Sequence, residues 1–515
     1  MMPIEPGIME QFGMIIPLLL LVVFASSILL IDVFAESENK NYLGYLSAFF
    51  LFIVLIFVIK DFSSINKSVI LFKNNIVVDR FGLIFTAIFI FAGILTSLGA
   101  IDYLKKYDIA IGEFYSLMIF AVSGMSLMVF SISFMAVFVS LELMSLPIYA
   151  LSGMFRINKR SLESSAKYFI LGSVASSILL FGMALLYGAS GSVNFIEIGK
   201  FITSKYNNLN TLLSTDPIII IGMIMIFIGF MFKTATAPFH MWTPDVYEGA
   251  PTIVTGFMSV AVKAAAFATF LRVFGLSFDN TALLNTDKGL LAGTSWIQVL
   301  NTLALVTVIL GNLAALNQRN VKRILAYSAI AHAGYLMIGV VSYFIAKDSA
   351  SYSALILYFL SYTFTGMGAF VALSVFEPTD SNKVMLEDLN GVAYKKPFVA
   401  AMLSVFIFSF AGIPPMSGFF AKFYLFKSAY VNGGLHLQVI IALIASVLSV
   451  YYYLRILVHL YMKKSYDEIE ENNYYVASGS VLALVIAVFF VFNIGILPDW
   501  YITVIKNSFT SLIGG

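Results

Sequence analysis

Cysteine is absent from the 515 residues of this sequence, and histidine occurs only four times. A chain without thiols supplies no disulfide, iron–sulfur cluster or thiolate metal site, and four scattered histidines do not make a metal site either. We therefore expect neither a cofactor nor a metal in this chain. Charged residues are also scarce, at 11% against about 25% in an average soluble protein. The net charge of +2 gives no sign of a nucleic-acid-binding surface.

What the chain has instead is long apolar sequence, because 60% of its residues are hydrophobic. Runs of about 20 such residues recur from end to end, and each is long enough for a helix to cross a hydrocarbon core of ~30 Å. The sequence therefore predicts an all-α polytopic membrane protein with about 14 transmembrane helices. These spans are expected near residues 12–34, 43–60, 80–102, 113–130, 132–154, 161–189, 217–243, 252–276, 296–317, 321–345, 350–376, 396–430, 435–462 and 474–503.

Two segments between the spans have a character of their own. Two short β-prone runs around Lys73 to Asn75 predict an extramembrane hairpin, and residues 195–213, polar on one face, predict an interfacial helix. The loops after odd-numbered spans carry more Lys and Arg, which is typical of cytoplasmic loops. We therefore expect both termini on the periplasmic side of a bacterial inner membrane, with Lys322 and Arg323 in the cytoplasm. Residues Thr243 to Thr252 are expected to be a rigid cytoplasmic connector.

Two of the expected spans are interrupted. Residues 396–430 would extend about 52 Å as one helix, and Pro414 and Pro415 in their middle predict two half-helices. Residues 217–243 contain a similar break at Pro238. The broken spans are the seventh and the twelfth, so they would cross the membrane in opposite directions, as in inverted-repeat transporters whose sites lie at broken helices.

We thus expect two inverted five-helix repeats, each with a broken helix. The expected units are an N-terminal three-helix segment with the hairpin (1–110), the first repeat (111–276), the second repeat (290–462) and a C-terminal span (470–515).

Charged side chains inside the apolar runs mark the candidate functional site, because a charge at bilayer depth costs roughly 2.5–3.5 kcal/mol or more. The basic residues inside spans are Lys167, Lys233, Lys263, Lys422, Lys427 and Arg455. Lys427 and Arg455 lie near span ends, where a long side chain reaches the interface. Apolar sequence continues well beyond Lys233 and Lys263, so we do not expect their side chains to reach the interface. The clear acidic residue within a span is Glu142.

Lys167 has two candidate partners. Glu163, four residues earlier, favours a static helical ion pair, whereas Glu142 would pair with Lys167 across helices and offset the cost of burying both charges. A buried lysine can lose its proton near neutral pH. A series of such lysines, with a glutamate as a switchable partner, is therefore a physically reasonable proton relay.

Two histidines are further candidates. His332 lies in the middle of a span and shares its helix with Tyr327 and Ser328, which favours a hydrated polar path. His240 lies two turns from Lys233, although Pro238 interrupts that helix. Each histidine is also compatible with a hydrogen-bonded core residue that has no functional role.

Five sequence blocks resemble a known family. FKTATAPFHMWTPDVYEGAPTIVTGFMSVAVKAAAF, together with SLELMSLPIYAL, ESSAKYF, RILAYSAIAHAGY and AGIPPMSGFFAKFYLF, is similar to the antiporter-like subunits of respiratory complex I. The resemblance spans roughly residues 80–460. Within the family, Lys422 stands where the M-type subunit has a glutamate, and the L-type lateral helix is not found after the last span. These features and the phrase HMWTPDVYEGAPT favour the N type.

The resemblance implies a proton-translocating membrane-arm subunit of NADH-quinone oxidoreductase. It implies that NADH, FMN, iron–sulfur clusters and quinone bind in other subunits, and that the partners are the M-type and the small K-, J- and A-type membrane subunits. By motif it implies a coupling pair of Glu142 and Lys167 and a central lysine, Lys233. It implies a polar axis that continues through Lys263, His332 and Lys422, and it places His240 in a matching motif.

Two other functions remain open at this point. The same motifs occur in subunits of multisubunit Na⁺/H⁺ antiporters, so the chain could belong to such an antiporter. Alternatively, the charges could be static ion pairs in a purely structural scaffold.

Overall fold

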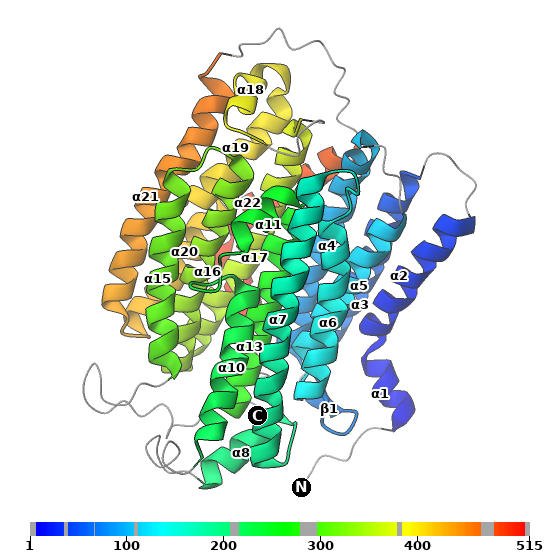
Figure 1. Cartoon of the computed structure of the whole chain (residues 1–515), viewed down its shortest axis with the longest axis vertical. Coiled ribbons are helices and arrows are strands. Elements are labelled where there is room, and N and C mark those ends of the chain that lie inside the picture. The colour runs from blue at the N-terminus through cyan, green and yellow to red at the C-terminus, as the bar shows by residue number, and fades with distance from the viewer. Residues whose placement is uncertain are drawn as a thin grey trace.

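The computed structural model describes residues 7–34, 40–65, 67–107, 112–205, 216–278, 296–378, 384–464 and 478–509 (Figure 1). Within these ranges, thirteen helices are long and apolar enough to cross a membrane, and a further apolar segment is divided into the shorter helices α19 and α20. The prediction of an all-α polytopic membrane protein is confirmed. The chain is a multi-pass membrane protein.

The N-terminal part contains three spans and a hairpin. Its helices are α1 (Ile8–Met14), α2 (Ile16–Phe34), α3 (Tyr42–Ser64) and α4 (Arg80–Lys106). Strands β1 (Val69–Leu71) and β2 (Ile76–Val78) pair antiparallel, with Leu71 opposite Ile76. This confirms the predicted hairpin, whose turn residues Phe72, Lys73 and Asn74 have a positive φ.

The middle part holds the first broken helix. Its elements are α5 (Gly112–Phe130), α6 (Phe134–Ser152), α7 (Lys159–Ser190), α8 (Phe195–Lys205), α10 (Pro217–Thr234), α11 (Thr243–Gly249), α12 (Thr252–Phe257), the π-helical turn η1 (Met258–Val262) and α13 (Lys263–Ser277). Helix α8 covers the first half of the predicted interfacial helix, and its remaining residues 206–213 lie outside the described ranges.

The last part holds the second broken helix. Its elements are α15 (Trp296–Leu316), α16 (Val321–Ala346), α17 (Ser349–Phe376), the 3₁₀ turn η2 (Glu387–Leu389), α18 (Val392–Lys395), α19 (Pro397–Ala411), α20 (Ser417–Val431), α21 (His436–Tyr461), α22 (Ser478–Ile496) and α23 (Pro498–Lys506). The predicted single span 474–503 is wrong in its last part, after Ile496. Because Pro498 starts a new helix after Leu497, α22 ends at Ile496.

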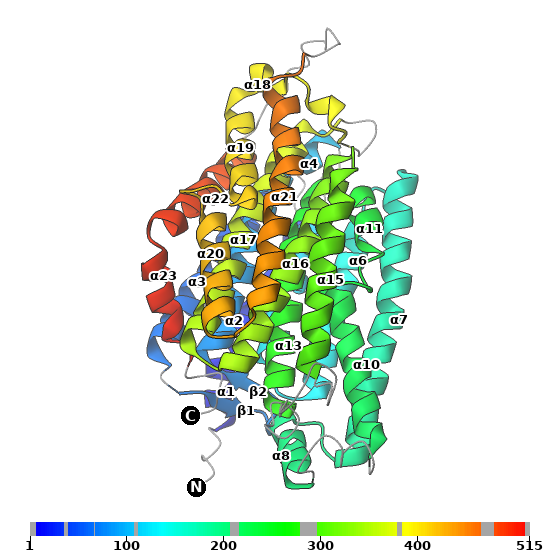
Figure 2. The same cartoon turned by 90° about the vertical axis from the view of Figure 1, so that its left-hand side faces the viewer.

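The two helix breaks have the same local geometry. Helix α10 ends at Ala235 and helix α19 ends at Gly412, both in the left-handed conformation. In each break a cis proline follows three positions later, Pro238 in the first and Pro415 in the second. Figures 1 and 2 show α11 above α10 but α20 below α19, so the two broken segments run in opposite directions.

Four long segments form the buried centre of the bundle: α4, α12 to α13, α16 and α17. Helices α2, α7, α15 and α21 have the smallest buried share of the thirteen spans, 33–39%, and lie at the periphery. Close packing depends on small residues at two crossings. A Cβ on Gly124 would lie 2.4 Å from the Met144 backbone nitrogen, and one on Gly311 would lie 2.6 Å from that of Ala331. The centre of the bundle is therefore where a polar side chain is kept from both lipid and water.

The expected connector from Thr243 to Thr252 is not a loop. Residues Thr243–Gly249 form α11, which continues the broken segment after Pro238, and most of its residues are buried. Pro244 occupies the first turn of this helix, where its missing N–H costs nothing. The connector prediction was wrong because a Pro- and Gly-rich composition also fits a short helix that begins at a proline.

Candidate functional site

Lys233 lies in the last turn of α10, directly before the first break. Only 2% of its surface is exposed. Its ammonium group donates to Ser145 Oγ at 2.8 Å and to the Tyr149 hydroxyl at 3.1 Å, both on α6. It also lies 5.3 Å from the centre of the Tyr149 ring, within cation–π range. Lys233 is thus held by neutral groups alone among the described residues.

Lys263 lies directly after the π-helical turn η1, in the fully buried segment α12 to α13. Single π-helical turns inside α-helices often occur at functional sites. The Lys263 ammonium donates to the backbone carbonyl of Ala329 on α16 at 2.8 Å. The buried amine therefore links the first half of the molecule to the second.

His332 is buried in the middle of α16. Its Nδ1 lies 2.6 Å from the Tyr358 hydroxyl, and its Nε2 lies 3.2 Å from the Tyr453 hydroxyl. Tyr453 also hydrogen-bonds Ser328 on the same helix. Because a neutral imidazole both donates and accepts, His332 can relay a proton between two hydroxyl groups.

Lys422 is buried on α20, after the second break. Its ammonium donates to the Phe410 carbonyl at 2.7 Å and to Ser446 Oγ at 3.0 Å. Like Lys233, it pairs with no carboxylate among the described residues. The Phe410 carbonyl belongs to the last turn of α19, so the lysine side chain folds back over the break.

Aromatic rings connect these four groups. Tyr168 lies 5.9 Å from Lys233 Nζ, and Tyr247 lies 5.8 Å from Lys263 Nζ. Trp242 stacks on Tyr168 at 4.7 Å and meets Tyr247 at 6.2 Å, which bridges the two lysines. In the second half, one ring, that of Tyr335, lies 5.7 Å from both the His332 ring and Lys422 Nζ. We call Lys233, Lys263, His332 and Lys422, with these rings, the buried axis.

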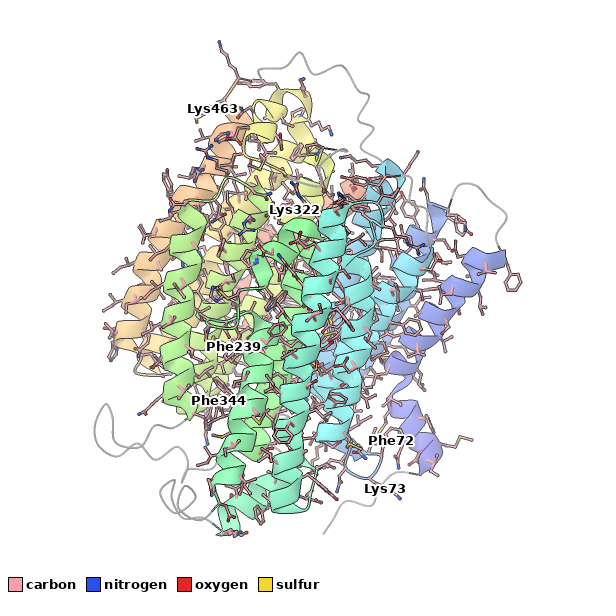
Figure 3. All side chains as sticks on the ribbon, viewed as in Figure 1. Phe72, Lys73, Phe239, Lys322, Phe344 and Lys463 are labelled. Atoms are coloured by element: carbon pink, nitrogen blue, oxygen red, sulfur yellow. The ribbon has the colours of Figure 1, made fainter. Side chains whose placement is uncertain are left out.

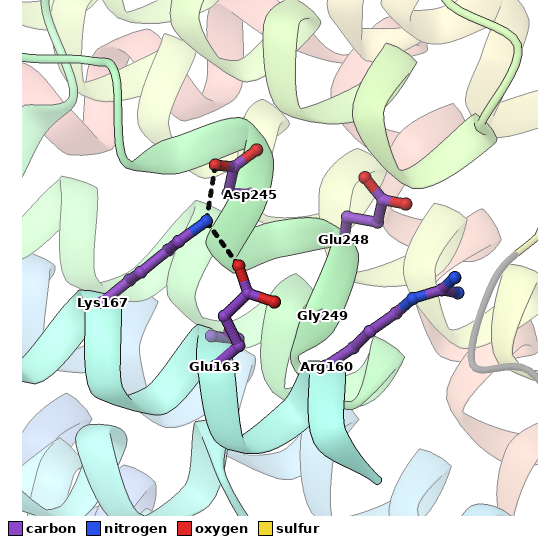
Figure 4. A pocket seen from close by; sticks show the side chains of 7 residues that line it. Arg160, Glu163, Lys167, Asp245, Glu248 and Gly249 are labelled. Carbon is purple, nitrogen blue, oxygen red and sulfur yellow. Dashed lines mark hydrogen bonds and ion pairs between the residues drawn. The ribbon is translucent and has the colours of Figure 1, made fainter.

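Lys167 does not join this axis. Its side chain is 41% exposed and forms ion pairs with Glu163 at 2.7 Å and with Asp245 at 3.1 Å, at a pocket that is open to the surface (Figure 4). The predicted pairing with Glu142 is absent, and Glu142 itself is half-buried without an ion pair among the described residues. The helical pair with Glu163, the other alternative, is the one that forms, because α7 lies at the periphery.

Asp245 on α11 extends this charged group to another helix. It accepts from Arg323 Nη1 at 2.8 Å as well as from Lys167. Burial raises the pKa of Asp245, but the hydrogen bonds from Arg323 and Lys167 outweigh it and hold the pKa below its usual value. The carboxylate thus ties α7, α11 and α16 together.

His240 lies in the first break, between Pro238 and α11. It is half-buried, and its Nδ1 has no hydrogen-bond partner among the described residues. Its backbone carbonyl accepts from Thr243 at 3.0 Å and so helps to start α11. No hydrogen bond between described residues joins the His240 side chain to the buried axis.

The sequence-based search missed two buried charged groups. Arg272 on α13 forms two hydrogen bonds of 2.9 Å with Asp79, the N-cap of α4, and both side chains are buried. Lys322, expected in the cytoplasm, is fully buried at the start of α16 and lies 4.0 Å from Glu377. Lys322 stands at the start of its span, where hydropathy gives no signal of burial, whereas Arg272 lies within the expected span 252–276, and its partner Asp79 comes from a distant segment.

Comparisons with known proteins agree with the motifs. Residues 131–449 match the family model described as NADH:quinone oxidoreductase/Mrp antiporter, TM. The chain is 38% identical over 492 residues to NADH-quinone oxidoreductase subunit N of Trichlorobacter lovleyi, which covers 95% of each protein. Among solved structures, it is similar to a chain of respiratory complex I from Thermus thermophilus, with 29% identity, a TM-score of 0.74, and coverage of 95% of this chain and 99% of that one. A chain of the Mrp complex from Dietzia sp. shares the fold at 18% identity, with a TM-score of 0.80 and 98% of each chain covered.

Proposed function

The chain belongs to the family of NADH-quinone oxidoreductase subunit N, and we propose that it translocates protons as a membrane-arm subunit of that complex. Protons pass along the buried axis, driven by quinone reduction elsewhere in the assembly. Lys233 is the central group of the first half, and Lys263, His332 and Lys422 continue the path into the second half. His240 is a possible further group, without an assigned step.

One observation carries this proposal: the axis lysines are buried against neutral partners. Lys233 bonds two hydroxyl groups, Lys263 a carbonyl, and Lys422 a carbonyl and a hydroxyl. A buried ammonium held by a carboxylate stays charged, whereas one held only by neutral acceptors bears most of its desolvation cost. Such an amine can release a proton and regain it, which a relay requires.

Glu142 and Lys167 are the proposed coupling groups. Glu142 has no ion pair among the described residues, so its charge can change without breaking one. Lys167 shares two carboxylates on two helices, and a lysine between competing carboxylates can shift when a nearby charge changes. Although the two side chains form no ion pair with each other, a charge change at the neighbouring subunit would act on each of them separately.

The rest of the assembly supplies the redox chemistry. The complex binds NADH, FMN, iron–sulfur clusters and quinone in other subunits, while this chain packs against the M-type and the small K-, J- and A-type membrane subunits in the lipid bilayer. We place both termini on the periplasmic side of a bacterial inner membrane, on the strength of the basic loops. The curated relatives named subunit N, 38% identical over 95% of the chain in one case, favour this complex over a Na⁺/H⁺ antiporter.

The test is Lys233→Met in the intact complex, with Lys427→Met as the matched control. Methionine keeps most of the lysine's volume but carries no proton, while Lys427 is an exposed lysine on α20 outside the axis. Proton pumping per NADH oxidised is measured in vesicles with a pH-sensitive dye, and assembly on a native gel. We expect Lys233→Met to lower pumping per NADH in an assembled complex, and Lys427→Met to leave it unchanged.

Normal pumping by assembled Lys233→Met would contradict the relay. A loss that tracks the loss of assembled complex would instead favour the scaffold function. Sodium transport without NADH would favour the antiporter.

A further inference from the structure

Glu377 is a buried carboxylate that the axis does not use. It caps the C-terminal end of α17, directly after Phe376. Only 1% of its surface is exposed, and both carboxylate oxygens lack a hydrogen-bond partner among the described residues. An unpartnered buried carboxylate is costly, and buried polar groups in native structures nearly always have partners.

Ammonium groups surround this carboxylate on several sides. Lys322 Nζ lies 4.0 Å from Glu377 Oε1, beyond hydrogen-bond distance, and donates to the Ala250 carbonyl at 2.7 Å. Lys106 donates to the backbone carbonyl of Glu377 rather than to its side chain. Lys396, before α19, donates to the Val375 carbonyl at 3.2 Å. None of these three lysines directly hydrogen-bonds the carboxylate, so a proton can occupy it.

The other titratable groups around the cluster come from α4 and α11. The Tyr103 hydroxyl accepts from the Thr252 amide and interacts with Glu377. Tyr107 bonds the Pro378 carbonyl. Glu248 is already bonded to Arg323 at 3.0 Å. Within the part of the chain that the structure describes, the titratable groups of this cluster are Tyr103, Lys106, Tyr107, Glu248, Lys322 and Lys396.

The cluster lies at one end of the bundle, next to the axis. Figure 3 shows Lys322 toward the same end as Lys463 and away from Phe72 and Lys73 in the hairpin. Lys322 and His332 are ten residues apart on α16, or about 15 Å at 1.5 Å per residue. Ser328 and Tyr453, which are hydrogen-bonded to each other, lie along that interval, and Tyr453 contacts His332.

We propose that Glu377 is a proton-loading site for the buried axis, on the side of the basic loops. This rests on the proposed function of the axis. A proton entering from that side binds a Glu377 carboxylate oxygen and makes it neutral. Lys322 first releases one of its own protons toward Tyr453 and His332 and becomes a neutral amine. The carboxyl O–H bond of Glu377 then breaks as an N–H bond forms on that amine, which restores the carboxylate–ammonium pair.

The decisive variant is Glu377→Gln in the intact complex, with Glu387→Gln as the matched control. Glutamine keeps the shape of the side chain but cannot carry a proton, while Glu387 is an exposed glutamate in the same loop. We expect Glu377→Gln to lower proton pumping per NADH about tenfold or more. Tenfold is a lower bound, because the usual effect of losing a group that transfers a proton is larger. Redox-induced infrared difference spectra should lose a carboxylic-acid C=O band in Glu377→Gln, and Glu387→Gln should keep both pumping and the band.

Two further variants separate proton transfer from a static ion pair. In Glu377→Gln/Lys322→Met both charges are gone, so a purely structural pair predicts that the double variant regains pumping. The proposal predicts that it does not. If Glu377→Gln fails to assemble, Glu377→Asp keeps the acid with one methylene fewer, and it should keep an infrared band with a shifted pH dependence of pumping.

Wild-type pumping by Glu377→Gln with the infrared band retained would overturn the proposal, and so would recovery in the double variant. The proposed function fails separately, through normal pumping by Lys233→Met. Loss of pumping in Lys233→Met with normal pumping in Glu377→Gln would therefore reject the loading site and leave the axis intact.

Discussion

The buried pair of Asp79 and Arg272 allows a quantitative prediction. Each Arg272 nitrogen that contacts Asp79 does so at 2.9 Å, and both side chains are buried. Removing one partner of such a pair leaves an uncompensated buried charge and costs about 3–5 kcal/mol. Arg272→Met should therefore destabilise the subunit by about 3–5 kcal/mol. Asp79 also caps α4 through the Gly82 amide at 2.8 Å, so Asp79→Ala should cost about 1 kcal/mol more.

A double variant distinguishes the contribution of the ion pair from the contributions of the two separate residues. Asp79→Asn/Arg272→Met keeps a capping oxygen and removes both charges, and we expect a cost of about 1–2 kcal/mol, less than either single change. The measurement is the free energy of unfolding of the subunit in mixed detergent micelles, in a double-mutant cycle made of Arg272→Met, Asp79→Asn and the double variant. A cost for Arg272→Met below about 1 kcal/mol, or additive costs in the double variant, would refute the reasoning, since both outcomes mean that Asp79 does not need its partner.

Three further changes have definite expected outcomes. Lys422→Met should lower proton pumping per NADH in vesicles while native gels show normal assembly, because it removes the exchangeable proton of the second half. Gly495→Ala should destabilise the subunit by about 1–3 kcal/mol and so reduce the amount of assembled complex on a native gel, because the added Cβ would lie 1.9 Å from the Pro415 carbonyl in the second break. Gly188→Ala is the control and should be tolerated, because its Cβ would meet nothing within 4 Å. Because the pKa of Asp245 is depressed, its ion pairs stabilise α11 fully above the ordinary aspartate pKa, and this stabilisation is lost as the pH falls through the depressed pKa. Hydrogen exchange of α11 amides should therefore quicken only in acid.

The spans and breaks could be predicted from the sequence because their physical signals are local. A helix needs about 20 apolar residues to cross the membrane, and Pro238 and Pro415 interrupt that pattern visibly. The axis lysines were equally visible, since Lys233 and Lys263 stand inside long apolar runs. The spans, the breaks and these lysines can each be predicted from one continuous stretch of sequence.

The partners of the charged groups could not be predicted, because they come from distant segments. Ser145 lies 88 residues from Lys233, and Ala329 lies 66 residues from Lys263. Lys167 shows the same limit, since its exposure depends on α7 being peripheral, which its apolar sequence does not reveal. Periodicity finds a buried lysine but does not name the hydroxyl or carbonyl that holds it.

Span ends were the second limit. Lys322 looked like a basic loop residue, yet it is fully buried because the end of α11 and the end of α17 pack over it. At the end of a span, the burial of a side chain depends on where the neighbouring helices end and not on the hydropathy of its own sequence. The positive charge that suggested the cytoplasm is instead part of the cluster around Glu377.

The position of ordered water in a high-resolution map of the whole complex tests the central claim most directly. The Tyr247 hydroxyl, between Lys233 and Lys263, is buried without a partner among the described residues, and such groups usually bind water. We predict a continuous line of water that links Lys233, Lys263, His332 and Lys422. Dry apolar packing between Lys233 and Lys263 would contradict the relay.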